Sequence, residues 1–162
     1  MAASLKDTRF LRNAFGRFAS GVTIVSCQSD IGIHGMTANS FISVSLEPAR
    51  ALISVAKSAQ MHERLMRQER FGLSVLSEGQ SDISTHFAGR PIAGLTPDFE
   101  YQFDVPVLAG ALSWMVCKRQ SEVEIGDHTL FIGDLIDCGY KEEQAPLVYF
   151  GGRYNALAPV AQ

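Results

Sequence analysis

Residues 34–57, which read HGMTANSFISVSLEPARALISVAK, alternate small polar and apolar side chains. Thr37, Asn39 and Ser40 carry hydroxyl or amide groups, and Met36 and Phe41 flank them. A flat, mostly apolar ligand with a polar edge needs much van der Waals contact and a few placed hydrogen bonds. The residue types in this stretch favour a ligand of that kind.

The run SVAKSA at 54–59 leads directly into a predicted helix. Ser58, Ala59 and Gln60 would present free backbone N–H groups at the start of that helix, and Lys57 adds a positive charge beside them. Helix N-termini bind phosphate through such groups. A ring-binding face followed by a phosphate site indicates a flavin nucleotide.

His128 stands in the tripeptide GDH between two predicted strands. Gly126 and Asp127 predict a tight turn, with the imidazole projecting from its tip. Two interpretations stay open: Asp127 caps the turn beside a solvated histidine, or His128 serves a site. Of the other histidines, His62 is expected to be a solvated or half-buried surface residue.

The remaining motifs exclude several classes of protein. His34 and His86 are open between core and site, and no histidine spacing predicts a metal site. The dinucleotide, phosphate-loop, serine-hydrolase and zinc-protease signatures are absent. Cys27, Cys117 and Cys138 form no CxxC pair, so we expect three reduced thiols acting as small core residues.

Hydrophobic periodicity predicts the elements that position these residues. Helices are expected at 4–19 with a capping box of Ser4 and Asp7, at 58–70 with an N-cap at Ser58 and with Met61, Leu65 and Met66 buried, and at 79–88 with Ile83 and Phe87 inward. Strands are expected at 22–29, 33–37, 40–46, 50–57, 71–77, in two long runs on either side of the GDH turn, and at 146–154; residues 89–110 are expected to form an irregular loop. Strands joined by tight turns favour an antiparallel barrel or sandwich with helices outside.

Length and charge set further limits. The chain has 162 residues and a net charge of -3, which predicts a single domain over 1–162 and argues against nucleic-acid binding. No apolar run reaches the ~20 residues of a bilayer span, and no signal peptide is recognised. These features predict a cytoplasmic protein with no membrane partner.

The chain resembles the flavin reductase-like family of FMN-binding split barrels over about residues 10–157. The segments that carry the resemblance are FGRFASGVTIVS (15–26), GMTANSFISVSLEP (35–48), SVAKSAQMHERL (54–65), FGLSVLSEGQ (71–80), HFAGR (86–90), PVLAGALSWMVCK (106–118), GDHTLFIGDL (126–135) and PLVYFGGRY (146–154). The resemblance implies a mainly β fold with flanking helices, built on a six-stranded antiparallel Greek-key split barrel. It also implies a homodimer with flavin near the subunit interface.

The family's activity implies a reaction and a set of site residues. NADH or NADPH would reduce FMN or FAD, and the reduced flavin would diffuse to a flavin-dependent monooxygenase. The implied flavin-binding residues are Thr37, Ala38, Asn39 and Ser40 at the ring, Ser54, Val55, Ala56, Lys57 and Ser58 at the ribityl chain and phosphate, and Phe87, Ala88 and Arg90 at the tail. His128 and Tyr154 resemble residues that border the nicotinamide pocket.

Two other functions remain open on the same fold. One is a split-barrel flavoprotein that reduces another acceptor, such as a corrinoid. The other is a protein that binds flavin without turnover. The sequence does not distinguish FMN from FAD or NADH from NADPH, because the adenylate half contacts variable loops and no Rossmann acidic residue is available.

Overall fold

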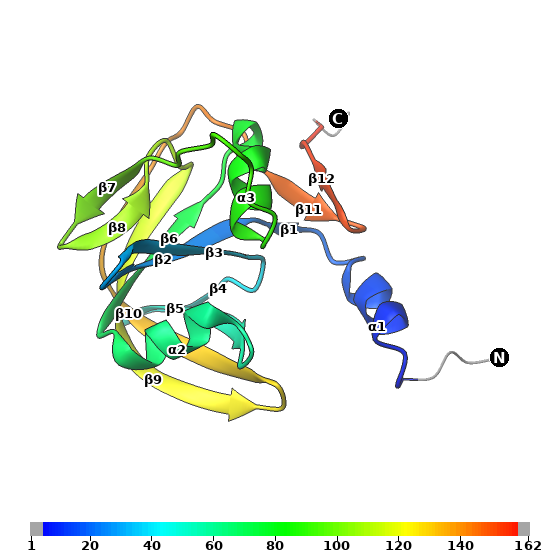
Figure 1. The fold of residues 1–162 in the computed structure, drawn as a ribbon, viewed down its shortest axis with the longest axis horizontal. Coiled ribbons are helices and arrows are strands. Elements are labelled where there is room, and N and C mark those ends of the chain that lie inside the picture. Colours follow the sequence, from blue (N-terminus) through cyan, green and yellow to red (C-terminus); the bar gives the residue numbers. More distant parts are fainter. Residues whose placement is uncertain (1–4, 159–162) are drawn as a thin grey trace.

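The computed structural model describes residues 5–158, and its centre is an antiparallel sheet of seven strands (Figure 1). The order across the sheet is β3-β2-β6-β9-β10-β5-β4. These strands are β2 (Thr23–Ser29), β3 (Gly32–Ala38), β4 (Ile42–Leu46), β5 (Ala49–Ala56), β6 (Arg70–Val75), β9 (Ser113–Ile125) and β10 (His128–Tyr140). The predicted mainly β, antiparallel class is confirmed, with seven strands in the main sheet where six were expected.

The core lies against the inner face of this sheet because its strands alternate buried and half-exposed residues. On β5, Ala51, Ile53 and Val55 are buried while their neighbours are half-exposed. Phe131 on β10 points into the same core cluster. Side chains of a strand alternate between its two faces, so one apolar residue in two suffices to cover a core.

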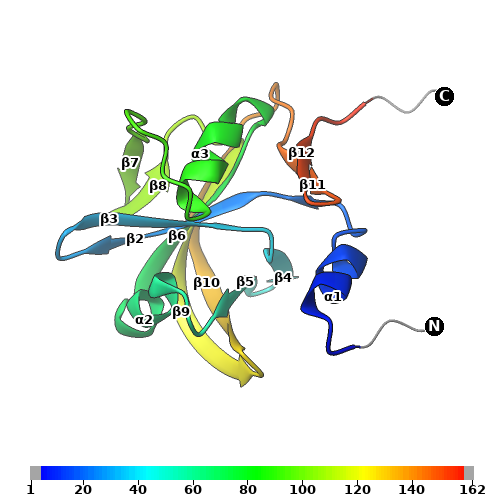
Figure 2. The ribbon, with the colours of Figure 1, turned by 45° about the vertical axis from the view of Figure 1, so that its right-hand side comes forward.

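Two helices flank the sheet (Figure 2). Helix α2 (Gln60–Arg67) buries Met61 and Leu65, but Met66 is 40% exposed, so the expectation that Met66 is buried was wrong. The turn η1 (Glu78–Gln80) leads into α3 (Ser81–Phe87), where Ile83 and Phe87 pack against the core as predicted.

Residues 89–110 are not wholly irregular. Their second half forms a hairpin of β7 (Phe99–Gln102) and β8 (Val105–Leu108), and all of β8 is buried. The two turn residues, Phe103 and Asp104, have φ angles of 51° and 62°. A two-residue hairpin turn with both residues at positive φ is usually marked by Asn-Gly or Asp-Gly. Phe-Asp carries no such mark, which is why the hairpin was not predicted.

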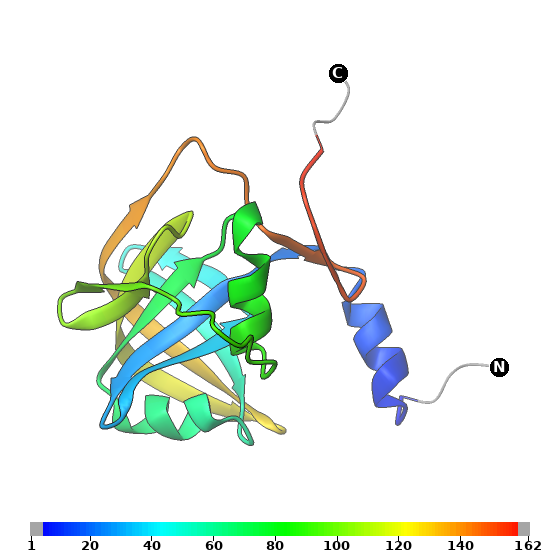
Figure 3. The same cartoon turned by 45° about the horizontal axis from the view of Figure 1, so that its top comes forward.

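The two ends of the described chain form an arm that stands off from the main sheet (Figures 1 and 3). The arm consists of α1 (Thr8–Phe15) and a small sheet of β1 (Ser20–Gly21), β11 (Val148–Phe150) and β12 (Arg153–Asn155). Tyr149 on β11 pairs with Ser20 on β1, and the N–H of Gly151 donates to the carbonyl of Gly16 at 2.8 Å. These bonds tie the start of the chain to its end.

Helix α1 is shorter than predicted. Asp7 is its N-cap, accepting from the N–H groups of Arg9 and Phe10, and the helix ends at Phe15. Ser4, the other half of the expected capping box, lies outside the described residues. None of the helix residues is buried, and Phe15 and Phe18 are 73% and 82% exposed. The apolar residues of this helix are thus not covered within the single chain.

The three cysteines are free, and their environments differ. Cys27 and Cys117 are buried core residues as expected, but Cys138 is exposed, against the prediction. Burial, with smaller effects from Asp134 and Cys138, raises the pKa of the Cys117 thiol to about 12. This thiol is therefore protonated at neutral pH.

The helices within residues 5–158 were also compared with the length and hydropathy of a membrane span, and none of them meets both requirements.

Gly72 on β6 should tolerate no side chain. A Cβ there would lie 2.4 Å from the carbonyl oxygen of Pro106, which is backbone and has little room to move. We expect Gly72→Ala to lower the free energy of unfolding by about 1–3 kcal/mol, as for other overpacked core sites. Urea denaturation measures this loss. Gly79→Ala, whose Cβ would meet nothing within 4 Å, is the control and should stay within ~0.5 kcal/mol of the parent; equal stability of the two variants would contradict the prediction.

Candidate functional site

A cavity of about 210 Å³ opens where the end of β3, helix α3 and the arm meet. We call it the Thr37 cavity. Its lining residues are Val22, Thr37, Ala38, Asn39, Ser84, Ala88, Tyr149 and Tyr154. The structure thus brings together five residues of the predicted site, Thr37, Ala38, Asn39, Ala88 and Tyr154, from three separate segments.

Hydrogen bonds hold the walls of the Thr37 cavity in place. The hydroxyl of Thr37 donates to the carbonyl oxygen of Ser84 at 2.6 Å, and the buried Ser84 hydroxyl pairs with the hydroxyl of Tyr154 at 2.7 Å. These hydroxyls are therefore engaged within the protein. The amide of Asn39, by contrast, has no hydrogen-bond partner within residues 5–158. Backbone groups and Asn39 are the polar groups left for a ligand.

Ser40 joins this cavity to the second part of the predicted site. Its hydroxyl donates to the carbonyl of Ser54 at 2.8 Å and lies 3.1 Å from the Ser54 N–H, which donates to it. Ser54 begins the segment 54–58 that was expected to hold the ribityl chain and phosphate. Ser40 thereby fixes the distance between the residues predicted to bind the ring and that segment.

Strand pairing brings the GDH turn to the other end of the same segment. His128 opens β10 and lies opposite Ala56 on β5, and the N–H of Lys57 donates to the carbonyl of Asp127 at 2.9 Å. His128 is therefore the first residue of a strand, one position beyond the turn tip where it was expected. Residues separated by some seventy positions in the chain become neighbours through this ladder.

Carboxylates of the β9–β10 hairpin contact both Lys57 and His128. Lys57 Nζ lies 2.8 Å from Oε2 of Glu124, and His128 Nδ1 lies 2.8 Å from Oδ1 of Asp127. The hydrogen bond and charge of Lys57 lower the pKa of Glu124, and those of His128 lower the pKa of Asp127. An anionic ligand that binds Lys57 must compete with Glu124.

The start of α2 differs from the expected phosphate site. The helix begins at Gln60 with Ala59 as its N-cap and no side-chain cap bond, so the assignment of Ser58 as N-cap was wrong. The chain first makes a turn, in which the N–H of Ala59 donates to the carbonyl of Ala56 at 2.9 Å. We predicted that the N–H of Ala59 would be free to bind a phosphate, but it is already bonded within this turn. Lys57 and Ser58 are nonetheless exposed.

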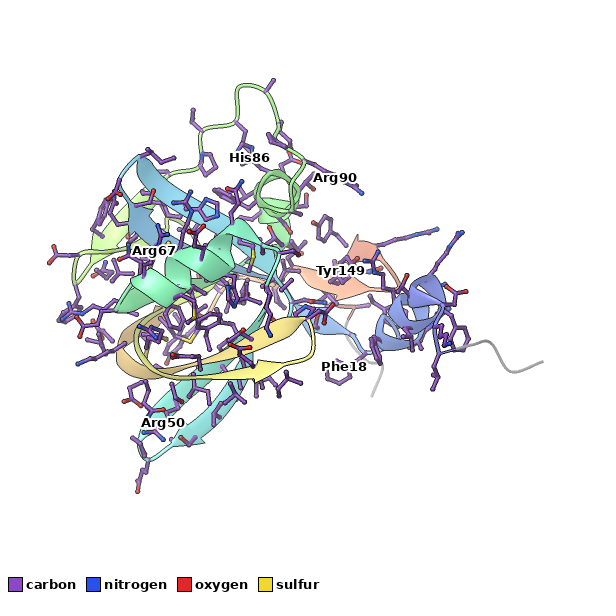
Figure 4. All side chains as sticks on the ribbon, turned by 60° about the horizontal axis from the view of Figure 1, so that its bottom comes forward. Phe18, Arg50, Arg67, His86, Arg90 and Tyr149 are labelled. Atoms are coloured by element: carbon purple, nitrogen blue, oxygen red, sulfur yellow. The ribbon has the colours of Figure 1, made fainter. Side chains whose placement is uncertain are left out.

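The HFAGR segment divides between core and surface. The Phe87 ring lies against β3, close enough that a Cβ on Gly35 would be 2.7 Å from it, and it packs edge-on to Phe99. Phe87 therefore does not line the cavity. Arg90, just beyond α3, lines a second cavity of about 230 Å³ together with Tyr149 and Tyr154. Figure 4 shows Arg90 beside α3 and Tyr149 on the arm. Lys57 does not line this second cavity.

Two of the histidines outside the GDH turn, His62 and His86, make hydrogen bonds and ring contacts within the fold. His62 Nε2 lies 2.8 Å from the hydroxyl of Thr129, and its ring is edge-on to Phe131, which matches the half-buried interpretation. Nδ1 of His86 accepts from the N–H of Ile92 at 3.1 Å. Burial, with a smaller effect from Arg64, lowers the pKa of His34.

Sequence reasoning missed Tyr149 and Ser84. Tyr149 lines both cavities and holds β11 against β1, and Ser84 anchors Thr37 and Tyr154. Tyr149 does stand within the PLVYFGGRY segment, five residues before Tyr154. The antiparallel pairing of β11 and β12 places it directly opposite that residue. The pairing of the two tyrosines was the signal that could have found it.

Comparisons with known proteins agree with this geometry. A family model described as the flavin reductase like domain matches residues 15–158. The NADH-dependent flavin reductase StyB of Pseudomonas fluorescens is 40% identical over 153 residues, which cover 92% of this chain and 89% of that protein. The reductase component of 4-hydroxyphenylacetate 3-monooxygenase from Thermus thermophilus is 36% identical over 146 residues, 90% of this chain and 94% of that protein.

A solved structure shows the same fold in a relative with bound nucleotide fragments. The NADH:FAD oxidoreductase SgcE6 of Streptomyces globisporus, in complex with NAD and FAD fragments, superposes with a TM-score of 0.92 at 38% identity, covering 100% of this chain and 99% of that one. The chain belongs to the flavin reductase-like family. The expected split-barrel fold, the NAD(P)H-dependent flavin reductase activity and the use of a flavin with a reduced nicotinamide nucleotide are confirmed.

The Ser40–Ser54 bridge should matter for both stability and alignment of the site. Ser40→Ala removes the partner of two backbone groups of Ser54, so we expect a loss of about 1–2 kcal/mol in the free energy of unfolding and weaker flavin binding. Denaturation and fluorescence titration with flavin measure the two effects. The control is Ser43→Ala, an exposed serine on β4 for which no side-chain hydrogen bond is found within residues 5–158. Equal behaviour of the two variants would contradict the prediction.

Proposed function

We propose that this flavin reductase binds the flavin ring in the Thr37 cavity, reduces it with NADH or NADPH, and releases it to a flavin-dependent monooxygenase. The observation that carries the proposal is the cavity itself, which places Thr37, Ala38 and Asn39 beside Ala88 and Tyr154. Its lining combines apolar surface with a few polar groups, as a flat heteroaromatic ring requires. Of the relatives named above, one is a flavin reductase and another the reductase component of a monooxygenase.

The residues fit a flavin in two respects. The cavity shares Ala88, Tyr149 and Tyr154 with the neighbouring Arg90 cavity, so a ligand larger than either one can extend across both. Strand β3 is an edge of the main sheet, so its outward backbone groups have no partner strand. Outward-facing backbone N–H groups at the end of β3 can therefore donate to the polar edge of the ring.

The protein's part in the reaction is positioning. A bound flavin supplies the ring that accepts a hydride from the reduced nicotinamide, a step that needs no acid or base from the protein. Backbone N–H groups near Ala38 and Asn39 would stabilise the negative charge that develops at the ring's polar edge. His128 borders the nicotinamide side in this proposal, held in orientation by Asp127 at 2.8 Å. Close alignment of two rings lowers a barrier by several kcal/mol.

We also propose a homodimer, a cytoplasmic location and one domain over 1–162. Exposed apolar side chains on edge strand β4 (Ile42, 56%; Val44, 47%; Leu46, 89%) and on the arm support the dimer, because such faces are usually covered. The three free thiols support a reducing compartment. The family model's span of 15–158 supports a single domain.

Steady-state oxidation of NADH and NADPH, each with added FMN and FAD, tests the proposed function. We expect turnover that depends on free flavin. Turnover only with another acceptor, or none at all, would reject the proposal in favour of a different flavoprotein or a binding protein.

A second prediction concerns His128. In the same assay His128→Ala should raise the KM for the nicotinamide nucleotide while flavin affinity changes little, and an unaltered KM would remove His128 from the site.

Lys57 should bind the flavin phosphate in competition with Glu124. We expect Lys57→Gln and Arg90→Gln each to weaken FMN binding by about 1–3 kcal/mol through loss of a charge-assisted hydrogen bond. Glu124→Gln should tighten FMN binding slightly, because the pair it breaks is solvent-exposed and contributes little. Fluorescence titration measures the affinities.

Riboflavin, which lacks the phosphate, is the control ligand and should bind the Lys57, Arg90 and Glu124 variants with the affinity of the parent. A double variant of Lys57 and Glu124 tests the competition, since the effect of Glu124→Gln should vanish when Lys57 is absent. Undiminished, salt-insensitive FMN affinity in both the Lys57 and the Arg90 variants would refute phosphate binding by these residues.

A further inference from the structure

Ser84 lies where three walls of the Thr37 cavity meet. It stands in α3 and is completely buried. Its carbonyl oxygen accepts two hydrogen bonds, from the N–H of Ala88 at 3.0 Å and from the hydroxyl of Thr37 at 2.6 Å. Its hydroxyl pairs with the hydroxyl of Tyr154 at 2.7 Å. One residue therefore holds lining residues from β3, from the end of α3 and from the arm.

The bond to Tyr154 connects β12 with the main body of the molecule. Strand β12 pairs only with β11, and all of its residues are exposed. The side-chain bonds of Asn155 stay within the arm, at the carbonyl oxygens of Phe150 and Arg153. Within residues 5–158, Tyr154 thus makes the one hydrogen bond that joins β12 to a residue outside the arm. Figures 1 and 2 show α3 beside this end of the arm.

The hydroxyl of Ser84 is not used for the helix in which it stands. A serine or threonine inside a helix commonly donates to the carbonyl four residues earlier. The next residue, Thr85, does so, and its hydroxyl donates to the carbonyl of Ser81 at 2.9 Å. Ser84 instead directs its hydroxyl across to the arm. Its contact with Tyr154 therefore serves the junction between α3 and β12 rather than the helix.

The ring of Tyr154 is only partly fixed by packing. Its side chain is 36% exposed, and its ring lies tilted against that of Tyr149 at 5.9 Å between centroids. Without Ser84, the Tyr154 hydroxyl can turn to water, and no polar contact then sets the ring at the cavity. The net contribution of one neutral hydrogen bond to stability is small, because water replaces the lost partner. The junction can therefore open without unfolding the core.

We propose that Ser84 is a positioning residue that holds Tyr154 against the ring bound in the Thr37 cavity, and that their hydrogen bond is a latch that closes β12 over this ring. The inference rests on the proposed function, which places the flavin ring in the cavity. Ser84 acts through Tyr154 and Thr37, since its own side chain is 0% exposed. When the latch breaks, β12 keeps only its pairing with β11, and the flavin can leave past Tyr154.

Two variants remove the latch from its two sides. We expect Ser84→Ala and Tyr154→Phe each to raise the dissociation rate of FMN, measured by stopped-flow fluorescence, about threefold to tenfold, as for loss of one neutral hydrogen bond. The double variant should be no faster than the single ones, because both remove the same bond. Ser26→Ala is the matched control: Ser26 is also 0% exposed and donates to the carbonyl of Pro106 at 2.6 Å, but it does not line the Thr37 cavity. It should lose stability and keep the parent's rate.

Amide hydrogen exchange, followed by mass spectrometry, gives a readout that does not depend on turnover. Peptides that contain residues 153–155 should exchange faster in both latch variants than in the parent and in Ser26→Ala.

Faster FMN dissociation together with faster exchange at β12 supports the latch. The inference is overturned by an unchanged FMN dissociation rate in Tyr154→Phe, which keeps the aromatic ring. It is also overturned by a double variant in which the two effects add, or by faster dissociation without faster exchange at β12. A parent enzyme that oxidises NADH with free flavin in any of these cases leaves the proposed function standing. A parent without flavin-dependent turnover refutes the proposed function and, with it, the inference.

Discussion

The pairing of β5 with β10 is the constraint on which the candidate site depends. Its register runs from His128 opposite Ala56 to Asp134 opposite Arg50, and it brings the GDH turn to the end of the 54–58 segment. At the near end of that segment, the Ser40 hydroxyl bonds to the backbone of Ser54. A shift of one residue would turn every side chain of β5 to the opposite face. Burial of Ile53 and Val55 holds the register, so core packing aligns the site.

Charge is arranged differently on the two sides of the Thr37 cavity. On the side of the β9–β10 hairpin, Lys57 and His128 are already paired with Glu124 and Asp127. Toward the arm, Arg90 and Arg153 line the Arg90 cavity, and Arg12 and Arg17 line a third cavity beside α1. A phosphate bound by Lys57 must displace an internal partner, which weakens binding and suits a flavin that has to leave after reduction. Within residues 5–158, the linings of these two cavities contain no carboxylate that an anion would have to displace.

The arm is held by backbone hydrogen bonds rather than by a buried core of its own. Its helix buries no residue, and Phe15 and Phe18 remain mostly exposed although their spacing is that of a packed helix face. It is anchored instead by backbone bonds, with Gly151 bonded to Gly16 and β11 paired with β1. The arm thus combines an apolar surface that a second subunit could cover with the glycine-rich wall of the cavity that Arg12 and Arg17 line.

The sequence by itself determined the elements whose signals are local. β-branched runs, apolar alternation and turn residues located β2 to β6, and the Gly126–Asp127 turn located the β9–β10 hairpin. The motifs MTANS and HFAGR pointed to residues that do meet, since Ala38 and Ala88 line one cavity. Local signals failed at Ser58, where the chain makes a turn before the helix begins. They also failed at Phe103, where the residues of the hairpin turn are atypical.

Only the tertiary structure decided which of these residues act together. It placed Tyr149 beside Tyr154 and paired Lys57 with Glu124, and it put Phe87 in the packing against Gly35 rather than at the cavity. The physical reason is that strand register and long-range hydrogen bonds join segments tens of residues apart. Periodicity reports which face of an element is apolar, but the identity of the segment that covers that face depends on how the whole chain packs.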